Sequence, residues 1–425
     1  MKISILLPYK ENYSKDYAGA VSVFINGINK KSIYRSSIKV FGNTDYKNIL
    51  SKNYVNIPFS KKIFQSSSKI YVNNFIKLEQ KRKSDILEIH NRPSYLKFFS
   101  YFKKKIVFYF HNDPLSMNGS TSVEERIFIL NICHKIIFNS EWTKKRFFNN
   151  LSKFYYNSEK IHVIHQSTSV KKIQFDKKEK IITFVGKLNS SKGYDLFGKA
   201  VIKILNEFKD WKAYSIGDES RKRPHINHIR HTEVGFLKHK NVLNFLNKSE
   251  IAVVPSRWEE PFGRTALESS SRACATIISN KGGLPETTDH CIILKKLSSN
   301  DLYIEIKKLI LNNKVRRNIQ IGGYNNVKHI TENNSRFIDD IREKLIHNFN
   351  LNFIRNKLRI VNIYNAGQKL NHRLYNISIG KKFTNGFIRN GHDVLEISDR
   401  DFIRQNRNIF QTKNIDKFQD YLINT

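Results

Sequence analysis

Short apolar runs alternate with amphipathic stretches along most of the chain, from residue 1 to about residue 350. The short runs are typical of strands buried on both faces of a parallel sheet, and the stretches between them have the period of helices. Strands that alternate with helices in this way favour doubly wound α/β domains. Ligands of such domains bind at the carboxyl ends of the strands, so polar residues that follow the apolar runs are the first site candidates.

Two alternating sets are present, and a polar, basic stretch without periodicity separates them at 166–179. The first set predicts strands at Ile3–Leu7, Ile38–Phe41, Ile86–His90, Ile106–His111, Ile136–Asn139 and Ile161–Ile164, with helices at about 19–30, 66–82, 121–133 and 141–150. The second set predicts strands at Ile181–Val185, Ala213–Ile216, Ile251–Val254, Thr276–Ser279 and Cys291–Leu294, with helices at about 193–208, 239–248 and 300–312. We therefore expect two Rossmann-like domains, at 1–167 and 178–333, and a long amphipathic helix at Asn334–Phe349, within a terminal segment 334–350.

Composition and charge narrow the class only slightly. The 425 residues are 40% hydrophobic, as in ordinary globular proteins, and no apolar run approaches the roughly 18 residues of a membrane span. The apolar run after Met1 is short and lacks a small-residue cleavage site, so we read it as the first strand of a cytoplasmic protein. Cys133, Cys274 and Cys291 have no zinc or disulfide spacing and are expected to be buried free thiols. A formal charge of +37 attracts phosphates, anionic membranes or nucleic acid. The charge is spread along a chain rich in Lys, Asn and Ile, which favours compositional drift as its origin.

The most informative stretch runs from Val253 to Glu268. An apolar strand enters a turn at Pro255, and two carboxylates, Glu260 and Glu268, follow with seven residues between them. Pro261 and Gly263 lie where the loop turns into a helix, whose free N–H groups can bind an anion. Two carboxylates could also be the acid and nucleophile of a glycosidase.

A second signal lies at 184–193, where a strand ends at Gly186 and a loop opens a helix near Gly193. Lys187 and Lys192 are five residues apart on this loop and can together neutralise a pyrophosphate. A hydrolase needs no such cradle, so the two lysines favour a transferase over a glycosidase. Other strand ends carry Gly217-Asp218, His90, His111-Asn112 and the glycines of Lys281-Gly282-Gly283.

These segments, in this order, resemble family 4 glycosyltransferases (glycosyl transferases group 1). The E-x7-E signature matches Glu260 and Glu268, and the family's G-R-L…K-G loop matches Gly186 to Gly193, with Lys187 where Arg is usual. The family's G-G-x-x-E turn matches Gly282 to Glu286, and Ala18-Gly19 stands where a Gly-Gly pair is usual. The resemblance covers about residues 1–350 and implies the GT-B fold: two Rossmann-like, doubly wound parallel-sheet domains that face a cleft, with the terminal helix crossing back to the first domain.

The resemblance also implies roles for individual residues. Glu260 would bind hydroxyls of the donor sugar, Glu268 the ribose hydroxyls, and Lys187 and Lys192 the donor phosphates. His111 would face the sugar, so the expected catalytic residues are His111, Lys187, Lys192 and Glu260. The expected donor-binding residues are Gly19, Gly186, Gly217, Asp218, Phe262, Gly263, Arg264, Glu268, Gly282 and Gly283, and the expected acceptor contacts are His90 and Asn112.

The implied function is a retaining hexosyltransferase that needs no metal and no cofactor. It would use a nucleotide-sugar donor and a glycan or lipid-linked acceptor in surface polysaccharide or lipopolysaccharide assembly, in the cytoplasm or peripherally on the inner face of the cell membrane. Nucleic acid is not expected as a partner of such an enzyme. The alternative is a basic protein that binds nucleic acid or membrane surfaces and keeps a decayed transferase fold.

Residues 357–425 begin a third pattern, with a strand at Lys357–Tyr364, a helix at about 373–390 and a strand at Asp393–Ile397. This segment resembles the opening βαβ unit of another Rossmann-like domain. About 70 residues cannot complete such a domain, so it either docks on the rest of the chain or belongs to a longer, bifunctional protein. Asp399-Arg400-Asp401 is a D-x-D string, but its place after a second strand favours an ordinary acidic residue over a metal ligand.

Overall fold

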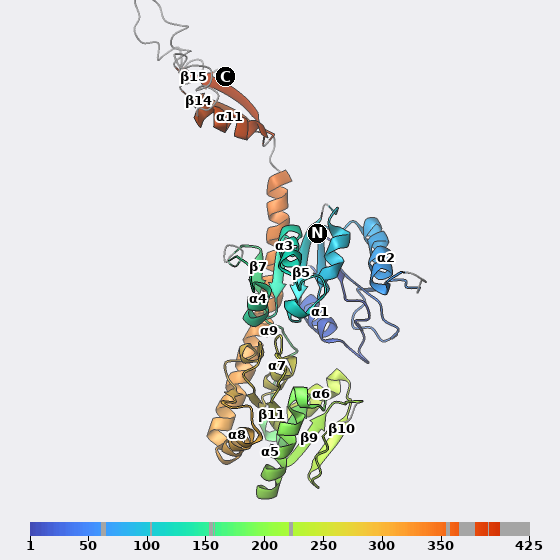
Figure 1. Cartoon of the computed structure of the whole chain (residues 1–425), viewed down its shortest axis with the longest axis vertical. Coiled ribbons are helices and arrows are strands. Elements are labelled where there is room, and N and C mark those ends of the chain that lie inside the picture. The colour runs from blue at the N-terminus through green and yellow to red at the C-terminus, as the bar shows by residue number, and fades with distance from the viewer. Residues whose placement is uncertain are drawn as a thin grey trace, which may run out of the picture. The chain divides into compact units, whose positions relative to one another are not determined.

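The computed structural model describes residues 1–60, 65–102, 104–152, 156, 158–220, 224–353, 358–364, 379–389 and 391–399. The chain divides into two units, Met1–Ile346 and His347–Thr425. The first unit contains two lobes, each built on its own sheet with helices packed on it (Figure 1).

The sheet of the first lobe has seven parallel strands among the described residues, in the order β3-β2-β1-β4-β5-β6-β7. Its strands are β1 Ile3–Leu6, β2 Ile38–Gly42, β3 Tyr54–Asn56, β4 Ile86–His90, β5 Lys105–Phe110, β6 Lys135–Phe138 and β7 Ile161–Val163. Its helices are α1 Ala20–Lys31, α2 Ser67–Arg82, α3 Val123–Ile132 and α4 Glu141–Phe147, with 3-10 turns at Pro93–Phe99 and Pro114–Ser116.

Alternation along β1 explains why both faces of this sheet are covered. Ile3 and Ile5 pack in a core with Phe24 of α1, whereas Leu6 points to the opposite face. The core on that opposite face includes Phe75 of α2. The polar residues that follow the strands are thereby left at the carboxyl edge of the sheet.

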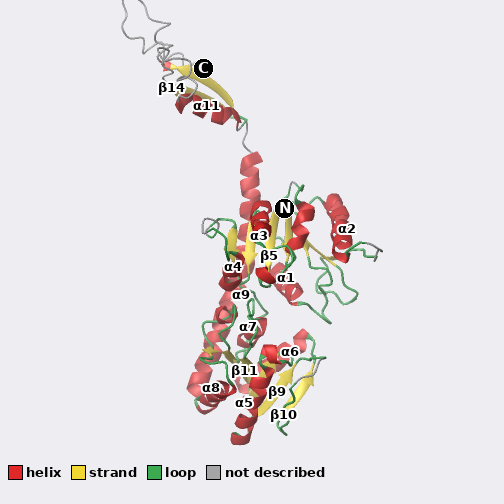
Figure 2. Ribbon diagram, in the orientation of Figure 1, coloured by secondary structure: helices red, strands yellow, loops and turns green. Residues whose placement is uncertain are grey.

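The sheet of the second lobe has six parallel strands among the described residues, in the order β10-β9-β8-β11-β12-β13. Three of them, β9, β10 and β11, are labelled in Figure 2. Its strands are β8 Glu179–Val185, β9 Lys212–Ile216, β10 His231–Gly235, β11 Ser249–Val254, β12 Ala275–Ile278 and β13 Ile292–Ile293. Its helices are α5 Tyr194–Glu207, α6 His239–Lys248, α7 Arg264–Ser270 and α8 Ser299–Leu311, with 3-10 turns at Phe175–Lys177, Ser190–Lys192 and Leu284–Glu286.

One helix, α9 Asn313–Phe353, joins the two lobes. Val327 packs with Phe262 and Leu267 of the second lobe, whereas Ile338 and Ile341 pack in the core of the first. Arg342 of α9 is buried and forms a bidentate ion pair with Glu88 of β4, through Nε at 2.7 Å and Nη2 at 2.9 Å. The terminal helix therefore returns to the first lobe, where apolar packing, this buried ion pair and hydrogen bonds such as that from Ser32 Oγ to Asp339 at 2.7 Å hold it.

The predicted strands and helices of both lobes are confirmed, with small shifts at their ends, and three differences stand out. β3 and β10 were missed because β3 has three residues and β10 reads His-Thr-Glu-Val-Gly, so neither forms an apolar run, and both lie at sheet edges. The long helix begins at Asn313 and not at Asn334, because polar residues and the Gly322-Gly323 pair hide its start in the sequence. Cys133 and Cys274 are buried as expected, but Cys291 is only partly buried.

The second unit contains β14 Arg359–Tyr364 and β15 Asp393–Ser398, which pair in parallel, and α11 Ile379–Arg389. The order strand, helix, strand is as predicted, and the resemblance of this segment to the opening of a Rossmann-like domain stays a prediction. The first part of the predicted helix, residues 373–378, and Arg400 and Asp401 of the D-x-D string lie outside the described residues. No helix in the described part of the chain is long and apolar enough to cross a membrane.

Candidate active site

A cavity of about 220 Å³ opens where β8 and β11 end. Gly186 and Lys192 line it from the segment after β8, Glu260 from the loop after β11, and Gly263 and Arg264 from the start of α7. β8 and β11 are neighbouring parallel strands, so their carboxyl ends meet at one edge of the sheet. The lysine loop and the E-x7-E segment, which are far apart in the sequence, therefore form one site.

Lys192 and Glu260 face each other in this cavity as an ion pair between Nζ and Oε1. The same carboxylate oxygen accepts a hydrogen bond from Ser256 Oγ at 3.0 Å. The side chains of Lys192 and Glu260 are 30% and 15% exposed, so both can be reached from the cavity. Lys187, which follows Gly186, is exposed and does not line this cavity.

Two glycines of this site, Gly282 and Gly217, lie very close to the backbone of a neighbouring loop. Gly282 has a φ of +59°, and a Cβ there would lie 2.2 Å from the carbonyl oxygen of Glu260. The N–H of Gly283 donates a hydrogen bond of 2.6 Å to that oxygen. Gly217, with a φ of +138°, meets Gly186 in the same way, since its Cβ would lie 2.0 Å from Gly186 O. Glycine is required at such positions because a side chain would strain the backbone and displace its neighbour.

Glu268 is buried on α7 between an arginine and a histidine. Its Oε1 lies 2.8 Å from His239 Nε2 and 2.7 Å from Arg264 Nε. Burial alone would raise the pKa of Glu268, but the charges of Arg264, His239 and Arg272 outweigh it and lower the pKa. Glu268 is therefore an anion that accepts hydrogen bonds and is poorly suited to act as a general acid.

His111 directly follows β5 in the first lobe, and its side chain is almost completely buried. Burial, reinforced by the positive charge of Arg264, lowers the pKa of His111 to about 3. The ring contacts Phe24 edge-on at 5.2 Å between centroids, and Nδ1 is a buried atom without a hydrogen-bond partner among the described residues. His111 is thus a neutral imidazole at pH 7, and one of its ring nitrogens is left unused.

His90 and Asn112, the expected acceptor contacts, lie differently. His90 Nδ1 is 2.9 Å from His111 Nε2, and His90 is 1% exposed, so it reaches a ligand only through His111. Asn112 is exposed, and its backbone N–H donates to Asn91 Oδ1 at 3.1 Å. The same amide oxygen accepts from the N–H of His111 at 3.2 Å, which makes Asn91 the residue that fixes this strand end.

Gly19 is the N-cap of α1 and has an ordinary φ of −72°. The need for glycine there is steric, because a Cβ would lie 2.0 Å from Glu11 Oε1. Glu11 accepts a hydrogen bond from the N–H of Ser22 at 3.0 Å, and burial raises the pKa of this carboxyl. A carboxyl group therefore occupies the space beside Gly19 at the start of α1, where the resemblance implies a donor contact.

The remaining predicted residues are near the cavity but offer mainly backbone groups. Phe262 is 2% exposed and packs in a core with Leu267, so its N–H rather than its ring is available to a ligand. Asp218 follows Gly217, and its carbonyl oxygen accepts a hydrogen bond from Leu188 N at 3.4 Å. Within the described ranges no group of three or more His, Cys, Asp or Glu side chains is placed to hold a metal ion.

Sequence reasoning missed three partners. Ser256 contacts Glu260, and His239 contacts Glu268. Glu286 of the second lobe bonds to the first lobe. Its carboxylate accepts hydrogen bonds from the backbone N–H groups of Glu141, at 2.6 Å, and Trp142, at 2.9 Å. Glu286 therefore caps α4 of the opposite lobe. His239 had one available signal, since it opens the helix that follows Gly235.

The chain has two parallel α/β lobes, joined by a connecting segment and by a helix that returns to the first lobe. Residues able to bind a ligand lie at the strand ends. This arrangement defines the GT-B class. The family model described as glycosyl transferases group 1 matches residues 165–326, which form most of the second lobe and contain the whole 220 Å³ cavity.

The chain is similar to one curated protein over part of its length and to solved structures over most of it. The chain is 30% identical over 142 residues to an uncharacterized 42.6 kDa protein in the cps region of Klebsiella pneumoniae, and this covers 33% of the chain and 35% of that relative. Sucrose-phosphate synthase from Thermosynechococcus elongatus superposes with a TM-score of 0.65 at 14% identity, over 82% of this chain and 100% of that one. HepE of Anabaena, solved in complex with UDP-glucose, superposes with a TM-score of 0.60 at 14% identity, over 80% and 100% of the two chains. The fold is GT-B.

Proposed function

We propose that this protein is a retaining glycosyltransferase that moves a hexose from a nucleotide sugar to a glycan or lipid-linked acceptor without a metal ion. The observation that carries the proposal is the Lys192–Glu260 pair in the cavity at the ends of β8 and β11, within the segment that matches the family model. A cation and a hydroxyl acceptor side by side suit a molecule that has a phosphate next to a sugar.

In this proposal the donor replaces the internal ion pair. The pyrophosphate takes the ammonium of Lys192, with Lys187 adding charge from the rim, and Glu260 then accepts hydrogen bonds from hydroxyls of the sugar. Glu268 is the ribose ligand, and its contacts with Arg264 and His239 hold it in place. The backbone N–H groups of Phe262, Gly263 and Arg264 face the phosphates and the sugar.

Catalysis then rests mainly on positioning and on stabilising the charge of the leaving pyrophosphate. The resemblance implies that a phosphate oxygen of the donor takes the proton of the acceptor, so no side chain is needed as a base. His111 would face the donor sugar. The lowered pKa of His111 is compatible with that position, because a neutral imidazole does not compete with the lysines for the phosphates. His90 would position His111 rather than touch the acceptor.

The setting follows from the resemblance and from one relative. A relative in a cps region supports a role in surface polysaccharide assembly, and lipopolysaccharide assembly is the other family-level option. We propose a cytoplasmic enzyme that works at the inner face of the cell membrane, where a basic surface favours anionic lipids.

Thermal unfolding of the purified chain with a panel of nucleotide sugars, in the presence of EDTA, tests the donor class. A bound donor should raise the midpoint by mass action, and NMR of the product should show that the anomeric configuration is retained. The Lys192→Ala variant should lose the shift, whereas Lys199→Ala, an exposed lysine on α5, should keep it.

Two outcomes would count against the proposal. If no donor changed the midpoint and none were hydrolysed, the enzyme hypothesis would fail. Steep salt-dependent binding to duplex DNA, together with no binding of nucleotide sugars, would favour the alternative of a basic binding protein on a decayed transferase fold.

A further inference from the structure

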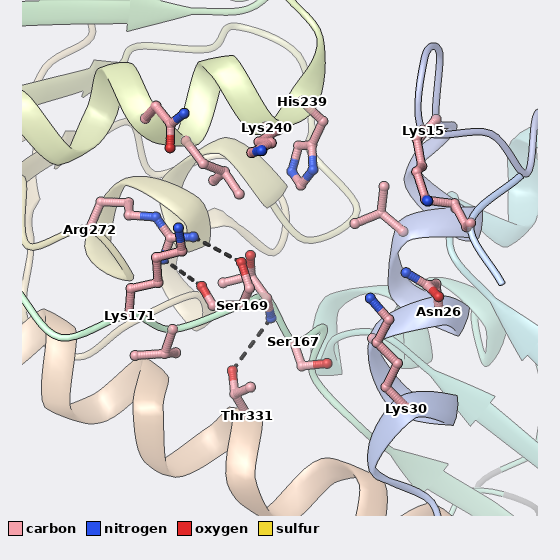
Figure 3. A pocket seen from close by; sticks show the side chains of 18 of the residues that line it. Lys15, Asn26, Lys30, Ser167, Ser169, Lys171, His239, Lys240, Arg272 and Thr331 are labelled. Carbon is pink, nitrogen blue, oxygen red and sulfur yellow. Dashed lines mark hydrogen bonds between the residues drawn. The ribbon is translucent and has the colours of Figure 1, made fainter. Parts of the chain in front are cut away.

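A second and much larger cavity, of about 1100 Å³, lies between the two lobes. It is lined by α1 of the first lobe, by α6 of the second, and by the connecting segment 167–172 and α9 (Figure 3). None of the residues predicted for donor, acceptor or catalysis lines it. It adjoins the candidate active site through His239, which lines this cavity and contacts Glu268.

Lysines from several separate elements converge on this cavity. Lys30 comes from α1, Lys171 and Lys172 from the connecting segment, Lys240 from α6 and Lys328 from α9. Lys30, Lys171 and Lys240 are seen around the opening in Figure 3. Within the part of the chain that the structure describes, none of these five forms an ion pair, and of the acidic lining residues Asp16 already pairs with Lys238 at 2.8 Å while Glu332 has no partner.

The wall that carries two of these lysines is held in place from behind. Arg272 is 1% exposed, and it donates hydrogen bonds to the carbonyl oxygen and, at 2.8 Å, to the hydroxyl of Ser169. The N–H of Thr168 bonds to Thr331 of α9 at 3.4 Å. A buried arginine therefore fixes the segment, so Lys171 and Lys172 start from an anchored backbone.

Unused hydrogen-bonding groups line the same cavity. Thr168 is 6% exposed, and its hydroxyl oxygen is a buried atom without a hydrogen-bond partner among the described residues. Asn26 Oδ1 of α1, on the opposite wall, is in the same state. Buried polar groups are normally satisfied, so these two residues mark positions on the cavity walls where the described residues leave a polar atom without a partner.

Apolar side chains complete the lining. Val23 of α1, Val170 of the connecting segment, and Leu243 of α6 face the cavity together with the lysines. Like charges that face one another across a concave surface repel, and a multivalent anion relieves that repulsion. Lysine is a common partner of phosphate as a point charge.

We propose that this cavity is a binding site for a ligand that carries a phosphate or pyrophosphate group, separate from the donor site. The phosphate lies against Lys171, Lys240 and Lys30, and the less polar part of the ligand packs on Val23, Val170 and Leu243. Because the lysines belong to both lobes, the ligand bridges them beside the segment that connects them. The chemistry is shared by the headgroup of an anionic lipid and by a free phosphorylated molecule.

The test uses the full chain carrying Lys192→Ala, so that phosphate binding at the candidate donor site does not contribute. Two probes separate the sources: inorganic pyrophosphate, followed by calorimetry, and vesicles of phosphatidylcholine with or without phosphatidylglycerol, followed by co-sedimentation. In this background the cavity variant carries Lys171→Glu and Lys240→Glu. The matched control carries Lys199→Glu and Lys209→Glu, the same change of net charge at exposed positions outside the cavity.

We expect the control to bind at least one probe like its parent, and the cavity variant to bind it about a hundredfold more weakly, since each charge-assisted hydrogen bond contributes about a factor of ten. The charge-conserving variant Lys171→Arg/Lys240→Arg should bind the probe like the parent, so that a loss in the glutamate variant reports on charge and not on misfolding. Binding of pyrophosphate indicates a free ligand, and binding of phosphatidylglycerol vesicles alone indicates a lipid headgroup. The proposal is overturned if neither probe binds the parent, or if the cavity variant and the control bind equally. The experiment uses no nucleotide sugar, so the outcome of this test is independent of the proposed transferase activity.

Discussion

Lys192 and Glu260, sixty-eight residues apart in the sequence, form an ion pair in the cavity at the end of the second sheet. Each is the other's partner in the structure, although both are expected to bind the donor. In the proposed mechanism the pair keeps a cation and a carboxylate ordered until the donor's phosphate and a sugar hydroxyl replace it. Breaking the pair from either side should therefore harm donor binding and transfer more than it harms the fold, because both side chains are partly exposed.

We expect Lys192→Ala to lower kcat/KM by a factor of about 10² to 10³, the usual effect of removing a group that stabilises developing negative charge. Glu260→Ala should lower it by a factor of about 10², because the sugar loses a contact that positions it. Initial rates of sugar transfer and the midpoint of thermal unfolding would be measured for both. Glu207→Ala, an exposed carboxylate that pairs with Lys307, is the control and should retain full activity. Activity within twofold of the parent in either site variant would contradict the assignment.

Lys187 offers a gain-of-function test. Arginine presents a planar fork that binds phosphate with two parallel hydrogen bonds, whereas lysine acts as a point charge. Lys187→Arg is expected to bind the donor about three- to tenfold more tightly, and Lys187→Ala about tenfold more weakly. Titration of the donor by calorimetry measures both, and weaker binding by the arginine variant would show that Lys187 does not contact the phosphates.

Gly282→Ala should destabilise the protein by about 2 kcal/mol or more, because it combines a left-handed backbone with a clash against Glu260 O. Gly235→Ala is the matched control: its φ is +79°, but no atom lies within 4 Å of the position of its Cβ. That variant should lose only the backbone term of about 1 kcal/mol. Denaturation midpoints of the two variants would be compared. Equal losses of stability would mean that the loop around Glu260 shifts to accept the new methyl group without a loss of free energy.

The ion pair between Arg342 and Glu88 predicts a stability effect far from the cavity. Its side chains are 2% and 1% exposed, so Arg342→Met leaves a buried carboxylate without its partner. We expect a loss of about 3–5 kcal/mol in the free energy of unfolding. Arg336→Met, at an exposed position of the same helix, is the control and should change stability by less than about 0.5 kcal/mol. A loss below about 1 kcal/mol for Arg342→Met would show that α9 is held mainly by apolar packing.

Acid sensitivity follows from His111. Its pKa falls from 6.5 to about 3 in the folded state, so below pH 6.5 the unfolded chain binds protons that the folded chain refuses. Stability is therefore lost as the pH falls from about 6.5 towards 3, by about 2 kcal/mol at pH 5 from this group alone. Unfolding midpoints between pH 7 and 5 should decline more steeply for the parent than for His111→Gln. Parallel declines would contradict the neutral, buried imidazole.

The order of motifs anticipated much of the candidate site. Gly186, Lys192, Glu260, Gly263 and Arg264 line one cavity, as expected from their places at strand ends of a parallel sheet. Lys187 and His90 were expected beside them, but one is exposed outside the cavity and the other is buried behind His111. A motif specifies which loop a residue occupies, whereas the direction of its side chain depends on packing against other loops.

The sequence by itself determined the two parallel sheets and the loops that meet at their edges, because apolar periodicity and loop chemistry are local properties of the chain. The sequence did not predict the edge strands β3 and β10, because neither contains an apolar run and each is formed by pairing with a neighbouring strand. Only the tertiary structure decided that Glu286 caps a helix of the opposite lobe, that His239 meets Glu268, and that lysines of both lobes surround one cavity. Each of these contacts joins segments distant in sequence, and no local pattern records which distant groups folding brings within hydrogen-bonding distance.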